Sequence, residues 1–362
     1  MVGTRCFETE DKSRKEFFKD GKDSFRRLKV RFYYPGKEDP TKKLCDLNDE
    51  KVLKEVKVKA DLNAYRQRES IYEDLEMEDG IFPLILYSHG YGWVAEANSD
   101  LCRHLAENGY IVASISHTYE ELETRFSDGE IVPFDQKTYK KMTKPLIPAY
   151  LDLILMGKKK MTYEEAVKRF DSHQKKYEKY MVERAHQWLE DDRHILRFIH
   201  EMNEEEGSFL YRKIDFSHGV GATGHSFGGA AAYGHCLNDD EISCGVNMDG
   251  ALFGDHKDKI NHKPFMQMIN KSNPHYVARA LVCHDKPVHF LTFRDMTHMG
   301  FTDLKLLTDK KMLVGKLDAK VAMKAINDAH LSFFDRYLKN ADSENREKLP
   351  IAEEALQSYE IL

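Results

Sequence analysis

A serine placed to act as a nucleophile stands in the middle of residues 224–228, which read Gly-His-Ser-Phe-Gly. This Gly-x-Ser-x-Gly pattern is typical of a tight strand-to-helix turn, where small residues flank the serine because strand and helix pass close together. Small apolar residues at 219–223 predict a buried strand before the turn, and 227–237 contains no proline that would end a helix after it. Ser226 is therefore the candidate nucleophile.

The same stretch also matches a dinucleotide-binding pattern, Gly-x-Gly-x-x-Gly, at Gly219, Gly221 and Gly224. That pattern needs a hydrophobic strand before its first glycine. Residues 213–218 are too polar for such a strand, so we interpret the match as coincidental. The chain also carries no His-Glu-x-x-His, calcium-loop or phosphate-loop motif, and we predict no cofactor and no metal.

A serine hydroxyl needs a base to take its proton. His298 is the candidate base, because it stands in a loop after the predicted strand 287–293 and before the last predicted helix, 317–338. The chain has 17 histidines, and three others lie close to or within the same motifs. These are His89, His225 and His289, each of which could instead be buried and merely hydrogen-bonded.

The base needs an acid to orient it. Asp249 directly follows the predicted strand 242–248, at the strand end where catalytic groups collect in open α/β sheets. The next predicted strand, 264–269, is followed by residues 270–274, which supply no carboxylate. Asp249 is the preferred acid, although an aspartate before a glycine can also simply form a turn. Two other aspartates remain as alternatives, Asp285 and Asp295.

Backbone N–H groups must also hold the oxyanion that forms when an ester carbonyl is attacked. Residues 82–88 form a strongly apolar strand candidate, and 89–92 follow it as His-Gly-Tyr-Gly. We predict that the N–H of Tyr91 and the N–H of Phe227, directly after the nucleophile, form this oxyanion hole. The alternative for 89–92 is a plain glycine turn.

The three side chains follow in the order Ser, Asp, His, which is the order in α/β-hydrolases. Residues 98–108 predict a helix and 110–115 a strand, and strand, helix, strand in succession implies a parallel sheet. We therefore predict an α/β-hydrolase fold: a mostly parallel central sheet flanked by helices, with a helical insertion before the nucleophile strand. An alternating strand ending at Pro35 is expected near one sheet edge, and 351–362 reads as an amphipathic tail.

Residues 120–212 are the predicted insertion within a single domain, 1–362. An apolar patch at 151–156 belongs either to a lid over the site or to a packing helix that never moves. Thr162 and Glu165 form a capping-box signal, and apolar residues recur at helical spacing as far as Met202.

Four segments together resemble the plasma and type II platelet-activating-factor acetylhydrolases and their bacterial relatives: 88–92, 224–229, 248–250 and 297–298. The resemblance covers most of the chain except the middle, and an aspartate directly after the strand that follows the serine turn is its most discriminating part. It implies a calcium-independent serine esterase that removes short or oxidised acyl chains, from phospholipids in the best-studied members. Substrate choice is expected to lie in the long, charged segment after Tyr119, which does not align with the family.

Two other functions stay open. One is a general carboxylesterase or thioesterase with the same Ser226, Asp249 and His298. The other belongs to a different class, a hydrolase fold that has lost catalysis and acts as a binding module.

The amino-acid composition of the chain indicates which classes of partner it can bind. The chain has 362 residues, is 41% hydrophobic and carries a net charge of −6, so it can bury a full core and shows no basic surplus for nucleic acid. It contains no apolar run of about 18 residues that could span a bilayer, while peripheral lipid contact stays open. The first residues lack the apolar core of a signal peptide and the six cysteines lack metal-binding spacing, so we expect free thiols and a cytoplasmic location. A small-molecule or lipid ester is the expected partner, and the oligomeric state is not assigned.

Overall fold

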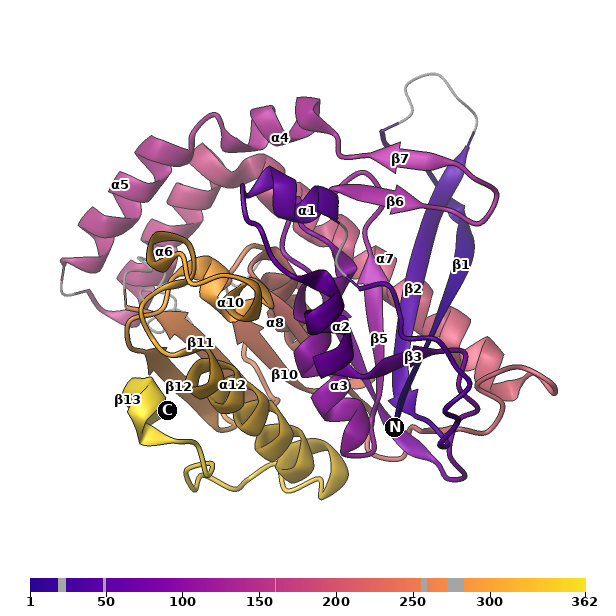
Figure 1. Cartoon of the computed structure of the whole chain (residues 1–362). Coiled ribbons are helices and arrows are strands. Elements are labelled where there is room, and N and C mark those ends of the chain that lie inside the picture. The colour runs from indigo at the N-terminus through magenta and orange to yellow at the C-terminus, as the bar shows by residue number, and fades with distance from the viewer. Residues whose placement is uncertain (19–23, 48–49, 160, 255–258, 272–282) are drawn as a thin grey trace.

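An 11-stranded sheet forms the centre of the protein. The computed structural model describes residues 1–18, 24–47, 50–159, 161–254, 259–271 and 283–362 (Figure 1). The strands of the sheet are β1 (Val2–Lys15), β2 (Phe25–Pro35), β3 (Ile71–Glu73), β4 (Phe82–Ser88), β5 (Ile111–Ser116), β8 (Ile214–Asp215), β9 (Val220–His225), β10 (Ile242–Met248), β11 (Phe265–Asn270), β12 (Val288–Phe293) and β13 (Leu356–Ile361). A separate hairpin pairs β6 (Glu123–Arg125) with β7 (Ile131–Pro133).

The strand order is β13-β12-β11-β10-β9-β4-β5-β2-β1-β3, with β8 paired to β4 beside this path. The six strands from β12 to β5 run parallel, which confirms the predicted sheet. Of the other five strands only β2 was predicted, and β1, β3, β8 and β13 were not. β1 pairs antiparallel with β2, so β2 is the third strand from that edge of the sheet. The segment expected to be a tail contains β13, which pairs antiparallel with β12. β1 and β13 are rich in charged or polar residues, which outer strands tolerate because one side of the backbone or one face meets water.

Eleven helices and five short helical turns accompany the sheet in the described part of the chain. The helices are α1 (Glu50–Glu55), α2 (Leu62–Glu69), α3 (Ser99–Glu107), α4 (Gln136–Thr143), α5 (Leu146–Gly157), α6 (Tyr163–His173), α7 (Lys179–Glu204), α8 (Phe227–Asn238), α10 (Leu304–Leu307), α11 (Lys311–Val314) and α12 (Ala319–Phe334). The turns are η1 (Ala95–Asn98), η2 (Gln174–Glu178), η4 (His298–Phe301), η5 (Asp335–Lys339) and η6 (Glu353–Ala355).

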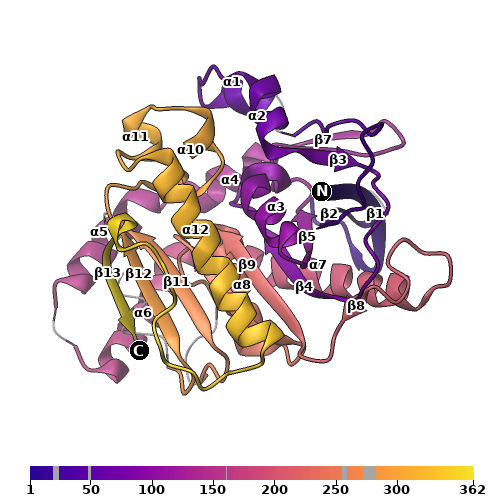
Figure 2. The ribbon, with the colours of Figure 1, turned by 60° about the horizontal axis from the view of Figure 1, so that its bottom comes forward.

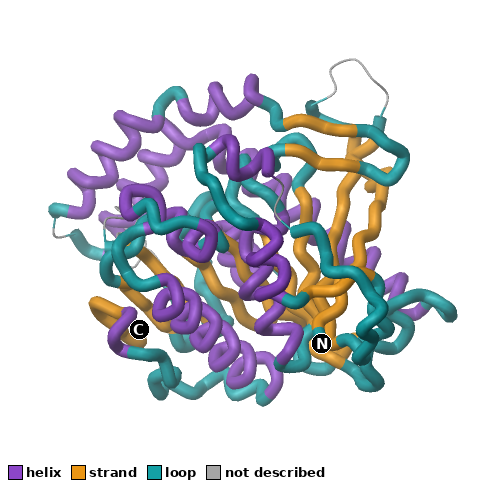
Figure 3. Tube along the Cα trace, in the orientation of Figure 1, coloured by secondary structure: helices purple, strands orange, loops and turns teal. Residues whose placement is uncertain are grey.

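Helices cover both faces of the sheet. α3 and α12 lie on one face, and α7 and α8 lie on the other (Figures 1 and 2). Side chains of successive strand residues point to opposite faces. On β2, Phe32 therefore joins the core under α7 and α8, while Tyr33 joins the core under α3 and α12. This three-layer arrangement, visible as purple helices around the orange sheet in Figure 3, is that of the predicted α/β-hydrolase fold.

The predicted insertion, 120–212, contains two kinds of structure. The β6–β7 hairpin, α4 and α5 run along the top of Figure 1 from right to left, and α6 follows below α5; together they form an outer arc. α6 begins with the predicted capping box of Thr162 and Glu165. α7, in contrast, buries Ile195 and Ile199 in the core against the sheet. Whether the outer arc moves as a lid, and whether 1–362 is one domain, stay predictions.

A buried cluster of charges fixes α7 to the sheet. The guanidinium of Arg26, on β2, contacts both carboxylate oxygens of Asp191 at 2.6 and 3.1 Å, and His117 Nδ1 lies 3.0 Å from the same carboxylate. Arg184 pairs with Glu120 in the same two-pronged way, at 2.7 and 2.6 Å. Burial alone would raise the pKa of Asp191, but Arg26 and His117 outweigh it and hold the pKa well below its ordinary value. Removing one partner would leave a buried charge uncompensated.

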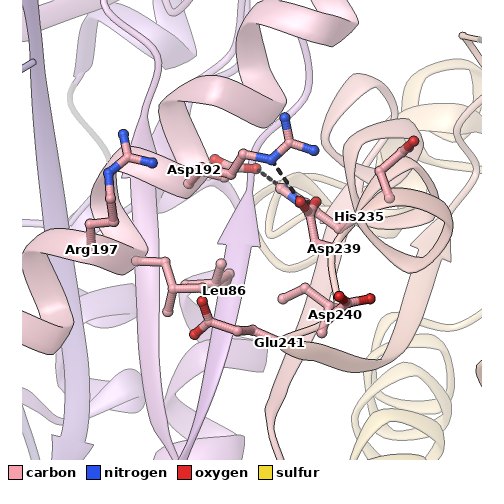
Figure 4. A pocket seen from close by; sticks show the side chains of 11 residues that line it. Leu86, Asp192, Arg197, His235, Asp239, Asp240 and Glu241 are labelled. Atoms are coloured by element: carbon pink, nitrogen blue, oxygen red, sulfur yellow. Dashed lines mark hydrogen bonds and ion pairs between the residues drawn. The ribbon is translucent and has the colours of Figure 1, made fainter. Parts of the chain in front are cut away.

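A second polar contact ties α7 to α8. Figure 4 shows Asp192 and Asp239 on either side of His235, beside a cavity of about 370 Å³ that Arg197 and Glu241 also line. His235 Nε2 lies 2.9 Å from Asp192 and Nδ1 lies 2.6 Å from Asp239. Burial alone would lower the pKa of His235, but the two carboxylates outweigh it and raise the pKa to about 9.

This contact predicts that stability falls as the pH rises. The folded-state pKa of His235 lies above its ordinary value of 6.5, so its stabilisation is complete below about pH 6.5 and is lost as the pH rises through about 9. The loss amounts to about 3 kcal/mol, because each pKa unit corresponds to about 1.4 kcal/mol. Urea denaturation between pH 6 and 9.5 should show a steeper decline for the parent protein than for His235→Gln. The matched substitution at the exposed His218 should keep the parent's slope, and equal slopes for parent and His235→Gln would contradict the assignment.

Candidate active site

The turn between β9 and α8 holds Ser226 in a strained backbone conformation. Its φ is 56° and its ψ is −114°, a combination that a residue with a side chain seldom adopts. The backbone N–H of Ser226 donates to the carbonyl of Met248, at the end of β10, over 2.8 Å. The neighbouring strand thus holds the turn that the Gly-x-Ser-x-Gly pattern predicts.

Close approach of three chain segments explains the glycines of this turn. A Cβ on Gly228 would collide with the carbonyl of Ser88, at the end of β4, and a Cβ on Gly224 would collide with the same carbonyl and with Gly228. The alternative dinucleotide pattern does not form a loop here. Gly221 and Gly224 lie within β9 itself, whereas a phosphate-binding glycine loop follows a strand.

The three predicted side chains come together at this turn. His298 Nε2 lies 2.9 Å from Ser226 Oγ, and His298 Nδ1 lies 2.7 Å from Asp249 Oδ2. Asp249 is buried, whereas the His298 side chain is 45% exposed. A proton on Nδ1, donated to the carboxylate, leaves Nε2 free to accept the Ser226 hydroxyl proton. This arrangement can activate a serine for attack on a carbonyl.

Asp249 is itself held by the next strand. Its N–H donates to the carbonyl of Met268 over 2.9 Å. Asn270, the last residue of β11, donates from its backbone N–H to Asp249 Oδ1 over 2.8 Å and from its side-chain Nδ2 to Oδ2 over 2.7 Å. The sequence analysis searched the residues after this strand only for a carboxylate. It therefore missed Asn270, whose amide holds the Asp249 carboxylate in place. The signal was present: a side chain at the end of the adjacent parallel strand must lie beside Asp249.

The other aspartates lie elsewhere. Asp285 pairs with His262 at 2.7 Å, and both side chains are exposed. Asp295 is exposed, and its backbone carbonyl accepts hydrogen bonds from the N–H groups of Lys316 and Leu317. His298 instead forms its carboxylate hydrogen bond and ion pair with Asp249.

The three other histidines are buried and hydrogen-bonded, as the alternative reading of the sequence allowed. Burial lowers the pKa of His89, His225 and His289 to about 3 in each case, so all three are neutral near pH 7. Their contacts are His89 Nδ1 with Gly90 O at 2.8 Å, His225 Nε2 with His298 O at 2.9 Å, and His289 with the hydroxyls of Tyr337 and Tyr359 at 2.6 Å each. His225 therefore supports the backbone of His298, a role that the sequence did not suggest.

The two predicted oxyanion donors belong to the segments that meet at Ser226. Phe227 is the first residue of α8, and the first N–H groups of a helix have no partner within it. Gly90 lies against the nucleophile, since a Cβ built on it would stand 3.3 Å from the Cβ of Ser226. The next residue is Tyr91, whose loop is fixed where the N–H of Gly92 donates to the carbonyl of Glu120 over 2.7 Å.

Aromatic rings gather around these two donors. The ring of Tyr91 stacks on Trp188 of α7 at 6.0 Å and meets Phe227 edge-on at 5.3 Å. Phe227 also contacts Trp188 at 4.8 Å and Phe253 at 5.4 Å. These rings come from distant parts of the chain, so sequence reasoning did not connect them. They give the site an apolar wall. Among the described residues, no group of three or more His, Cys, Asp or Glu side chains is placed to hold a metal ion.

A family model described as platelet-activating factor acetylhydrolase, isoform II, matches residues 17–354. The chain is 26% identical to the platelet-activating factor acetylhydrolase of Cavia porcellus over 289 residues, which cover 73% of this chain and 60% of that protein. It is 26% identical to the Bos taurus protein of the same name over 278 residues, or 71% and 57% of the two chains. The chain thus spans less than two thirds of the length of these relatives.

A solved structure has the same fold. The ferulic acid esterase from Streptomyces cinnamoneus superposes with a TM-score of 0.68, covering 99% of this chain and 96% of its own, at 20% sequence identity. At that identity the similarity concerns the fold alone.

The geometry predicts that Ser226 reacts with a fluorophosphonate probe and that Asn270 sets how fast. Asn270→Ala removes the hydrogen bond from Nδ2 to Asp249 Oδ2 and keeps the one from the backbone N–H to Oδ1, so we expect labelling to slow about ten-fold while the fold is kept. Asn63→Ala, on the exposed face of α2, is the matched control and should label at the parent rate. Stopped labelling reactions, resolved by gel fluorescence over time, give the rates. Labelling of Ser226→Ala at the parent rate would contradict the site.

Proposed function

Because the chain belongs to the platelet-activating factor acetylhydrolase isoform II family, we propose that it is a serine carboxylic-ester hydrolase that removes short acyl groups. The observation that carries this proposal is the line of hydrogen bonds from Asp249 through His298 to Ser226, at 2.7 and 2.9 Å. A serine in this setting has its base, and the base has its orienting acid.

In the first half of the proposed reaction, Ser226 Oγ attacks the ester carbonyl while His298 Nε2 takes the hydroxyl proton. The negative charge that develops on the carbonyl oxygen is held by the N–H groups of Tyr91 and Phe227. The imidazolium that forms at His298 is stabilised by the buried Asp249. Collapse of the intermediate breaks the ester C–O bond, and His298 gives its proton to the departing alcohol. The acyl group is then bonded to Ser226.

In the second half, water takes the place of the alcohol. His298 accepts a proton from water as the water oxygen attacks the acyl carbonyl, and the same two N–H groups hold the second oxyanion. Collapse breaks the bond to Ser226 Oγ, which regains its proton from His298. The products are a carboxylic acid and the free enzyme, and no cofactor takes part in these steps.

The proposed substrates are small or short-acyl carboxylic esters, including phospholipids that resemble platelet-activating factor. Support comes from the family and from the aromatic wall beside the oxyanion donors. Tyr91, Phe227 and Trp188 are bulky and packed against one another, with ring centroids 4.8 to 6.0 Å apart. A long acyl chain on this side would have to displace packed rings, whereas an acetyl group would not. A role in lipid degradation follows if the phospholipid is the physiological substrate.

Two alternatives remain. A general carboxylesterase or thioesterase would use the same machinery, and it would accept longer acyl chains or sulfur esters as readily as acetyl oxygen esters. A catalytically inactive binding module would bind esters without turnover. A cytoplasmic location is also part of the proposal, supported by six free thiols. Among the described residues, no helix is long and apolar enough to cross a membrane.

Hydrolysis of p-nitrophenyl esters tests the proposal. We expect kcat/KM to be highest for acetate, to fall as the acyl chain lengthens from acetate to octanoate, and to drop about 10⁴-fold or more in Ser226→Ala. Acetyl phosphatidylcholine should be cleaved in preference to its long-acyl counterpart in the same assay series.

The control is Ser332→Ala, a serine on the outer side of α12 whose hydroxyl donates to the carbonyl of Asp328. It should keep the parent's activity. A flat acyl-length profile, or equal rates for a matched thioester, would favour the general esterase or thioesterase. Turnover that survives in Ser226→Ala would contradict the proposed mechanism altogether.

A further inference from the structure

Helix α5 carries apolar side chains around almost its whole circumference. Its inner face is packed: Ala149, Leu153 and Met156 are buried, and Leu153 and Met156 share a small core with Phe170 of α6. In most proteins the opposite face of such a helix is polar. Here it is not.

The outer face of α5 is both apolar and exposed. Ile147 is 75% exposed and Leu155 is 60% exposed. Among the described residues, six of the 13 large hydrophobic side chains that are exposed lie in one short stretch, as Tyr139, Leu146, Ile147, Tyr150, Leu151 and Leu155. A helix that is apolar all round is expected inside a protein or against an apolar medium, and a concentrated exposed apolar patch marks a surface of contact.

The helix is held firmly by its inner side. Asp152, its one charged residue, forms an ion pair with Arg169 of α6 and lies 2.7 Å from His173 Nδ1. His173 Nε2 lies 3.2 Å from Glu178 in η2. The one charge on α5 therefore faces neighbouring helices, and the outer face is presented by a helix that is already packed.

Positive charges stand at both ends of this apolar face. Residues 136–159 contain six lysines and one aspartate, whereas the whole chain has a net charge of −6. Lys140, Lys141 and Lys144 precede α5, Lys158 and Lys159 follow it, and all five are exposed. An apolar helix face with lysines at its ends is complementary to a lipid surface that has an apolar interior and anionic headgroups, since the lysine side chains can extend to the headgroups.

The patch lies on the same part of the molecule as the site. Tyr139 of α4, which belongs to it, stacks on Tyr91 at 6.2 Å with an angle of 14° between the rings. On the other side, Gln174 of η2 donates from Nε2 to the carbonyl of Leu252, three residues after Asp249. Figure 1 shows α5 at the upper left margin of the molecule.

We propose that the outer face of α5, with the lysines at its two ends, docks on the surface of an anionic phospholipid bilayer. The helix lies in the plane of the interface, Ile147, Leu151 and Leu155 enter the acyl boundary, and the lysines contact anionic headgroups. A second copy of the chain suits this surface less well, because pairing two such faces would bring their lysines together. The proposal goes beyond the reaction at Ser226 and does not depend on it.

Sedimentation with vesicles tests the docking directly. The full chain should sediment with vesicles of phosphatidylcholine and phosphatidylserine, bind pure phosphatidylcholine vesicles more weakly, and be released as salt is raised. Ser226→Ala should sediment as the parent does, so a loss of catalysis and a loss of docking are read separately.

Two double variants separate the apolar and the charged contributions. Ile147→Glu/Leu151→Glu should lower the vesicle partition coefficient about 100-fold or more. Lys140→Gln/Lys141→Gln should lower it about 25-fold, since each lysine near an anionic surface contributes about five-fold. Ile81→Glu, at an equally exposed apolar residue before β4, and Lys320→Gln/Lys324→Gln, on α12, are the matched controls and should bind as the parent does. Far-ultraviolet circular dichroism and thermal unfolding confirm that each variant is folded.

Three results would overturn the proposal. One is the absence of parent protein from the anionic vesicle pellet. Another is equal binding by the α5 variants and their controls. The third is a dimer in sedimentation velocity that Ile147→Glu/Leu151→Glu converts to a monomer, without vesicle binding by the parent, which would assign the face to a second copy of the chain.

Discussion

The strained turn at Ser226 is the constraint on which the rest of the site depends. A residue with a side chain seldom combines a φ of 56° with a ψ of −114°, and it does so only where the surrounding structure holds it there. Here the ends of β4 and β9 and the start of α8 approach so closely that Gly224 and Gly228 have no room for a Cβ against the carbonyl of Ser88. That approach brings the loop after β4 beside the nucleophile. It thereby brings the two proposed oxyanion donors, Tyr91 and Phe227, close to Ser226.

The strain is held in place by hydrogen bonds that step across the sheet. The N–H of Ser226, just after β9, donates to the last residue of β10, and the N–H of Asp249, just after β10, donates to Met268 near the end of β11. Asn270 ends β11 and returns two hydrogen bonds to the Asp249 carboxylate. Ser226 and Asp249 are therefore each positioned by the parallel strand beside them. His298 lies in the loop after β12 and contacts both of them. On the far side, the buried pairs of α7 hold Trp188 against Tyr91 and Phe227. The same helix, α7, thus carries both Trp188 of the apolar wall and Asp191 of the buried charge cluster.

Sequence reasoning located what is encoded locally. The Gly-x-Ser-x-Gly turn, β4, β10 and the order of Ser226, Asp249 and His298 were predicted because each has a short signature, either a run of apolar residues or glycines at fixed spacing. It missed what depends on contacts between distant residues. β13 was expected as a tail, because its mixture of polar and apolar residues does not predict a strand until its pairing with β12 is known. Asn270, the aromatic wall and the pairing of Arg26 with Asp191, 165 residues apart, leave no local pattern. The family match and the fold agree with the prediction, while the chemical roles of the site residues rest on geometry.

The most direct test of the central claim is to trap the acyl-enzyme. The protein would be mixed with excess p-nitrophenyl acetate, quenched in acid within the first turnovers, digested and mapped by mass spectrometry, since a covalent intermediate accumulates when deacylation is slower than acylation. The acid quench unfolds the protein and so stops deacylation. The account predicts one acetyl group on the peptide that contains Ser226, and none on that peptide in Ser226→Ala. Turnover with an acetyl group on another side chain, or with the Ser226 peptide unmodified at every quench time, would contradict it.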